Sequence, residues 1–130
     1  MMIDKQARYL PTHEWVRKGP GKAYTIGLTA YAIEQLGDIV YLELPQVGRE
    51  LQKGEIFGVI ESVKSASDMY IPMGGKVTAV NTEVPDNPDM MKAEPYGKAW
   101  LIQTEVSKPA EFDGLMDAAA YEKFFETEAH

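Results

Sequence analysis

One lysine in the sequence stands between two apolar segments, where a modifying enzyme can reach it. Residues 56–63 and 69–73 are predicted strands, and Lys64 lies between them with the small residues 65–67. Small residues suit a tight turn and leave a lysine side chain unshielded. Lys64 is therefore a candidate attachment site for a covalently bound group at the tip of a hairpin.

The residues around Lys64 are weak support for a function by themselves, because most surface lysines only keep a protein in solution. Nothing near it predicts the burial that a catalytic lysine needs. His13 and His130 do not form a metal site on spacing, and Glu14 beside Trp15 is most simply an exposed acid. No metal site and no nucleophile–base pair is predicted.

The size and composition of the chain limit what it can do alone. It has 130 residues, 45% of them hydrophobic, which is enough for one domain with a modest core. Cysteine is absent, so disulfides and thiolate chemistry are excluded and redox work would need a cofactor. A formal charge of -7 without a basic stripe argues against nucleic-acid binding.

Targeting signals are not predicted. The first six residues lack the apolar region of a signal peptide and the Arg-rich pattern of a transit peptide. No apolar run reaches the roughly 20 residues that a membrane span requires. We therefore expect a cytoplasmic protein with no membrane partner.

The elements that would position Lys64 are mostly short strands. A turn at residues 18–21 joins predicted strands 14–17 and 23–28, and Thr29 caps a predicted helix, 30–36, that Gly37 ends. The remaining predicted strands are 39–44, a short one between Gly48 and Gly54, 56–63, 69–73, 76–80 and 100–102. Residues 85–97 are predicted as an irregular loop, and 108–111 and 117–125 as helix, in which Leu115, Tyr121, Phe124 and Phe125 could share an apolar face. This pattern predicts a mainly β sandwich or barrel covered at one face or end by C-terminal helices.

The segment from Val47 to Val80 resembles the biotinyl/lipoyl attachment module. That fold presents its modified lysine on a hairpin between two related sets of strands. Gly75 follows Lys64 at the spacing of lipoyl domains, and Glu61 matches an acidic residue used by lipoylating enzymes. Val63 and Ser65 flank the lysine where a biotin carrier has methionines, so the resemblance favours lipoate.

The resemblance extends from about Arg8 to about Phe125, to the H protein family of the glycine cleavage system. The matching motifs are Thr12-His13-Glu14-Trp15-Val16, Gln35-Leu36-Gly37-Asp38-Ile39-Val40, Glu43-Leu44-Pro45, Glu61-Ser62-Val63-Lys64, Ser67-Asp68, Asp86-Asn87-Pro88, Pro95-Tyr96-Gly97 and Trp100-Leu101-Ile102. Departures are Thr12 for a common Ser, Ser65 for Ala, and Lys76 for Glu. None alters the acceptor lysine, although Lys76 is expected to change the charge near the hairpin tip, where partners would dock.

The resemblance implies a single carrier domain over residues 1–130 that is not an enzyme. Its fold would be a flattened barrel-sandwich of the lipoyl-domain type, with an attachment core at about 22–104 and a helical segment at about 108–127. Lys64 would carry lipoate as an amide, Glu61 and Gly75 would help to recognise or position the hairpin, and Thr12, Glu14 and Asp68 would dock the aminomethyl-bearing arm.

The partners that the resemblance implies are enzymes of glycine cleavage. They are a pyridoxal-phosphate glycine decarboxylase, a tetrahydrofolate-dependent aminomethyltransferase, an FAD-containing dihydrolipoyl dehydrogenase, and a lipoate ligase or an octanoyl/lipoyl transferase. Two alternatives remain open. One is an H-like carrier that serves lipoate transfer or sulfur metabolism, and the other is a β-rich interaction domain without a cofactor.

Overall fold

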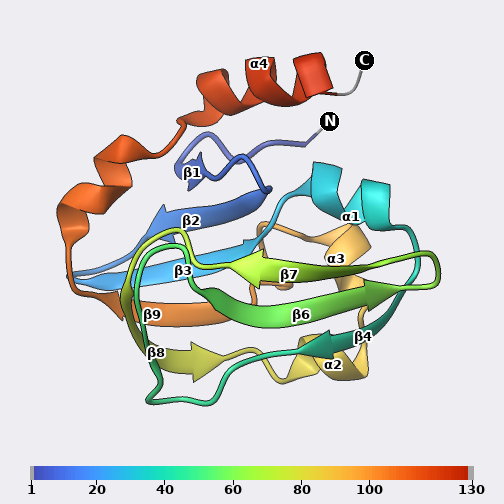
Figure 1. The fold of residues 1–130 in the computed structure, drawn as a ribbon, viewed down its shortest axis with the longest axis horizontal. Coiled ribbons are helices and arrows are strands. Elements are labelled where there is room, and N and C mark those ends of the chain that lie inside the picture. The colour runs from blue at the N-terminus through green and yellow to red at the C-terminus, as the bar shows by residue number, and fades with distance from the viewer. Residues whose placement is uncertain (1, 129–130) are drawn as a thin grey trace.

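The computed structural model describes residues 2–128 as two antiparallel sheets with short helices around them (Figure 1). The strands are β1 Ala7–Tyr9, β2 Glu14–Lys18, β3 Ala23–Leu28, β4 Ile39–Glu43, β5 Glu50–Leu51, β6 Ile56–Ser62, β7 Ala66–Tyr70, β8 Gly75–Val80 and β9 Ile102–Val106. The helices are α1 Ala30–Leu36, α2 Glu83–Asp86, α3 Met90–Ala93, the 3-10 helix η1 Pro109–Gly114 and α4 Ala118–Glu128. His130 lies outside the described residues.

The two sheets share one hydrophobic core. The larger sheet has the order β1-β2-β3-β9-β8-β5, and the smaller has the order β4-β6-β7. Buried side chains from both sheets, including Ile26, Ile60 and Ile102, belong to the same cluster. The expected mainly β barrel-sandwich is confirmed, in the form of two open sheets. Among the described helices, none combines the length and the apolar character that crossing a membrane would take.

Helix α1 begins and ends where its sequence signals predict. The hydroxyl of Thr29 accepts a hydrogen bond from the backbone N–H of Ala32, which satisfies a donor at the free end of the helix. Gly37 ends the helix with a φ of 81°, a backbone conformation that glycine adopts without strain, and its N–H donates to Ile33. The chain then turns directly into β4, so α1 lies beside the hairpin formed by β6 and β7 (Figure 1).

The C-terminal helical segment covers one end of the larger sheet. The rings of Tyr9 on β1 and Tyr121 on α4 stack with centroids 4.4 Å apart, and the backbone N–H of Tyr9 donates to Met116. Tyr121 and Phe125 are buried in a second cluster, against which Phe124 packs, whereas Leu115 belongs to the main core. The predicted shared face is therefore divided between two clusters.

Several elements differ from the prediction. Strand β7 begins at Ala66, because pairing with β6 draws the polar residues Ser67 and Asp68 into the ladder. The predicted loop at 85–97 contains α3 and the end of α2, which begins at Glu83, because buried Val84 and Met91 anchor these helical turns to the core. The last strand is β9, two residues later than predicted, and β1 is an additional strand whose three residues pair with β2.

Candidate functional site

Lys64 lies at the exposed turn between β6 and β7, and Ser62 holds that turn together. The buried hydroxyl of Ser62 accepts hydrogen bonds from the backbone N–H groups of Lys64, at 3.3 Å, and Ser65, at 3.1 Å. The Ser62 N–H donates to the Ser65 carbonyl at 2.7 Å. A side chain that bonds its own turn in this way supplies the order that a short loop otherwise lacks. The turn is thus fixed while the Lys64 side chain stays exposed to solvent.

A second set of contacts holds the turn against the end of α1. The Val63 N–H donates to the Asp38 carbonyl at 3.0 Å, and the Asp38 carboxylate pairs with Lys92 of α3. Gly37 has no side chain at this point, and a Cβ placed on it would lie 3.9 Å from Cε of Lys64. The end of the lysine side chain therefore lies beside the C-terminal end of α1.

Glu61 lies on β6, paired opposite Ala66 of β7 and next to the turn. Its side chain is half-buried, and on the other side its backbone pairs with Tyr41 of β4. A carboxylate in this position offers an acidic group close to Lys64. Its predicted role in recognition by a lipoylating enzyme stays a prediction.

Glu14 is buried, so the interpretation of it as an exposed acid is wrong. The residue is 1% exposed, and its two carboxylate oxygens accept hydrogen bonds from the Thr12 hydroxyl at 2.5 Å and the Tyr70 N–H at 2.7 Å. Burial disfavours the charged carboxylate and raises the pKa of Glu14 to about 7, although the two hydrogen bonds act in the opposite direction. The Glu14 carboxylate therefore connects β2 to β7 through the Tyr70 N–H, and the Thr12 hydroxyl binds its other oxygen.

Asp68 is exposed and lines a cavity of about 260 Å³ between the hairpin and α1, which we call the Asp68 cavity. Its other lining residues are His13, Leu28, Ala32, Gln35, Leu36, Ile60, Ser65, Ser67 and Met69. The walls are apolar near the core and polar near the turn. Thr12 and Glu14 are not among the lining residues, and Glu14 meets this region through the backbone of Tyr70, two residues beyond Asp68.

Gly75 lies apart from this region. It is the first residue of β8, which starts at the opposite end of the sandwich from the β6–β7 turn (Figure 1). A Cβ at Gly75 would lie 2.4 Å from the carbonyl oxygen of Glu105, so the absence of a side chain allows β8 and β9 to approach. The structure thus gives Gly75 a packing role in the larger sheet and does not bring it beside Lys64.

Three residues of the site were not identified from the sequence. Ser62 orders the turn, Tyr70 binds Glu14 through its N–H, and His13 lines the Asp68 cavity while its Nδ1 lies 2.7 Å from the Tyr121 hydroxyl. Only Ser62 carries a usable signal, because a serine just before a short turn often bonds the backbone. The other two depend on contacts between residues that are distant in sequence.

The arrangement suits the presentation of a covalent group on Lys64. The turn is fixed by backbone contacts, the lysine is exposed, and a cavity with an acidic side chain opens beside it. An acyl group on Lys64 would meet small or polar neighbours at its point of attachment. Among residues 2–128, no group of three His, Cys, Asp or Glu side chains is placed to hold a metal ion.

Residues 7–128 match the family model described as Glycine cleavage H-protein. The chain is similar to the Glycine cleavage system H protein of Symbiobacterium thermophilum, with 50% identity over 122 residues that cover 94% of each chain. It is 54% identical over 116 residues to the Rippkaea orientalis protein of the same name, covering 88% of this chain and 87% of the relative. The crystal structure of a glycine cleavage system H protein from Mycobacterium marinum matches with a TM-score of 0.84 and 30% identity, over 98% of this chain and 100% of that one.

Proposed function

Because this chain belongs to the glycine cleavage H-protein family, whose members are carriers and not enzymes, we propose that it carries lipoate as an amide on Lys64. On that group it would shuttle the aminomethyl unit of glycine from a pyridoxal-phosphate decarboxylase to a tetrahydrofolate-dependent aminomethyltransferase. The observation that supports this most directly is the exposed Lys64 on a turn ordered by Ser62, with the Asp68 cavity beside it.

Bound lipoate would supply a ring disulfide that accepts the aminomethyl group and is reoxidised later by a flavin-containing dihydrolipoyl dehydrogenase. The chain itself supplies position and shelter. The Ser62 hydroxyl and the Asp38 carbonyl fix the base of the arm by accepting hydrogen bonds from backbone N–H groups of the turn. Tethering in this way replaces the search for a free cofactor by a short movement of an attached one. Lipoate ligase or an octanoyl/lipoyl transferase would load Lys64, with Glu61 as a recognition residue.

Asp68 is the residue that a protonated amine on the arm would meet first. It is exposed at the edge of its cavity, and a carboxylate binds an ammonium group through charge-assisted hydrogen bonds. Glu14 is 1% exposed and covered by the Thr12 hydroxyl, so it would contact the amine only when Thr12 moves aside. We propose that Asp68 binds the amine of the loaded arm first. Thr12 and Glu14 would contact the amine only after Thr12 has moved aside.

The whole chain would act as one carrier domain in the cytoplasm. The attachment core proposed at residues 22–104 needs β1 and β2, which precede it and complete the larger sheet. The C-terminal segment packs on β1 through Tyr121 and so belongs to the same unit.

Reconstitution separates this function from its alternative, a carrier that serves lipoate transfer or sulfur metabolism. The lipoylated chain is mixed with the decarboxylase, aminomethyltransferase and dihydrolipoyl dehydrogenase, together with glycine, tetrahydrofolate and NAD. We expect NADH formation that depends on glycine and on the chain. Transfer of lipoate to other acceptors without glycine-dependent NADH formation would favour the alternative. Lys76 follows Gly75 in β8, so its charge lies away from the Lys64 turn and not near the hairpin tip (Figure 1). A Lys76→Glu variant, which reverses that charge, should therefore leave the rate of NADH formation unchanged.

A further inference from the structure

A second cavity, of about 450 Å³, lies on the opposite face of α1 from the Asp68 cavity. We call it the Met91 cavity. It takes Ala30, Ile33 and Gly37 from one face of α1, whereas the Asp68 cavity takes Ala32, Gln35 and Leu36 from the other. Residues three, four and seven apart share one face of a helix. Helix α1 therefore separates two cavities.

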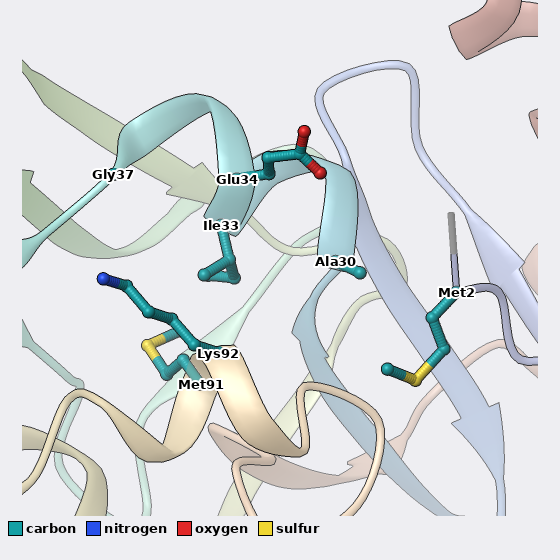
Figure 2. A pocket seen from close by; sticks show the side chains of 7 residues that line it. All are labelled: Met2, Ala30, Ile33, Glu34, Gly37, Met91 and Lys92. Carbon is teal, nitrogen blue, oxygen red and sulfur yellow. The ribbon is translucent and has the colours of Figure 1, made fainter.

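The Met91 cavity is mainly apolar. In Figure 2 the side chain of Ile33 points from α1 toward Met91 of α3, and Met2 lies at one end. Thioether side chains are flexible and polarizable and adapt to different apolar shapes. The lining also includes Glu34 and Lys92, but the Lys92 ammonium is paired with the Asp38 carboxylate at 2.5 Å. An uncharged acyl group can therefore enter this cavity without separating the Lys92 ammonium from its partner.

The Met91 cavity is connected to Lys64 through Gly37. Gly37 lines the cavity, and the Lys64 side chain lies against it, with Cε 3.9 Å from where a Cβ would be. From Gly37 the wall runs along α1 to Ala30, a helix of seven residues that spans about 10 Å. An eight-carbon acyl chain has a similar length. An acyl group on Lys64 would therefore start at one end of the cavity and reach along it.

We propose that the Met91 cavity holds the uncharged acyl arm on Lys64, as octanoyl or oxidised lipoyl, between visits to partner enzymes. This inference rests on the proposed attachment at Lys64. Each methylene removed from water favours docking by about four-fold, so two or three buried methylenes outweigh the loss of arm freedom. An arm that ends in a protonated amine gains nothing from apolar walls and, by the function proposed above, binds Asp68 instead.

The test follows methyl signals of the protein with ¹³C-methyl labels on Met and Ile. The chain is octanoylated with a ligase, and intact mass with peptide mapping first establishes that Lys64 carries the group. We expect the Met91 and Ile33 methyl signals to shift on octanoylation, with contacts from octanoyl protons to the Met91 methyl. No acylation of Lys64 would count against the proposed function. Acylation without these shifts, or with shifts only at Ile60, would overturn the inference alone.

A matched pair of variants adds a second readout. Ala30→Leu fills the Met91 cavity, and Ala32→Leu places the same side chain in the Asp68 cavity. In oxidised lipoyl protein, a phosphine should reduce the ring about four-fold faster, or more, in Ala30→Leu than in the wild type, because at least one methylene of the arm is no longer buried. Ala32→Leu should match the wild type. Equal rates in all three proteins would contradict the inference, and methyl spectra of the unacylated variants establish that each is folded.

Discussion

Glu14→Gln should change the dependence of stability on pH, because the wild-type carboxyl ionises in a buried place. Its pKa is raised from an ordinary 4.5 to about 7. Between these values the folded chain binds more protons than the unfolded chain. The stability that protonated Glu14 contributes is therefore complete below about pH 4.5, and it is lost as the pH rises to and through about 7.

The size of the effect follows from the two pKa values. Their difference corresponds to roughly 3 kcal/mol, and between pH 5 and pH 8 the loss is about 2–3 kcal/mol. Glutamine has the same shape, keeps an oxygen for the Tyr70 N–H and does not ionise. Relative to the wild type, Glu14→Gln should therefore gain about 2–3 kcal/mol of unfolding free energy from pH 5 to pH 8.

Urea unfolding at pH 5, 6, 7 and 8 measures this difference, with the fluorescence of Trp15, which is fully buried, as one probe. Glu122→Gln, a change at an exposed glutamate of α4, is the matched control and should show no such trend. A constant difference between Glu14→Gln and the wild type across this range would mean that the carboxyl ionises without a cost. The reasoning from burial would then be wrong.

Three further variants test the packing, the turn and the cavity. Gly75→Ala should lose about 1–3 kcal/mol of stability in urea unfolding, since the new Cβ would meet a β9 carbonyl oxygen at 2.4 Å, whereas Gly114→Ala has open space and serves as the control. Ser62→Ala should loosen the turn, seen as faster amide exchange at Lys64 and slower lipoylation; unchanged exchange would exclude its hydroxyl as the support. Asp68→Asn should release the aminomethyl unit faster, by roughly 10–100-fold if one charge-assisted bond is lost, measured as formaldehyde formation without the aminomethyltransferase. An unchanged rate there would place the docking site elsewhere.

The parts of the fold that the sequence predicts are those with local causes. Thr29 and Gly37 bound α1 because a cap and a positive φ act within one turn of helix. The small residues after Lys64 predict the turn, but they do not predict that Asp68 lies in β7, since that follows from pairing with Val59. Short strands such as β1 exist only through their partners.

The site shows the same limit. The buried Glu14 carboxylate is bound by the Tyr70 N–H, which is 56 residues away along the chain, so no local sequence pattern predicts the burial of Glu14. The position of Lys64 on an exposed turn was predictable, whereas the two cavities beside it were not, because α1, α3 and the hairpin build them together. The resemblance also implied that Gly75 helps to position the lysine, whereas the structure places Gly75 at the opposite end of the sandwich (Figure 1).

The central claim is that Lys64 is the one lysine that carries lipoate, and intact mass with peptide mapping tests it most directly. The wild type, Lys64→Arg and the control Lys53→Arg, a change at an exposed lysine of the β5–β6 connection, are each produced with a lipoate ligase and lipoate. We predict one lipoyl increment, on the peptide containing residue 64, in the wild type and in Lys53→Arg, and no increment in Lys64→Arg, with all three proteins folded. A lipoyl increment on Lys64→Arg, or on any other lysine of the wild type, would contradict the account.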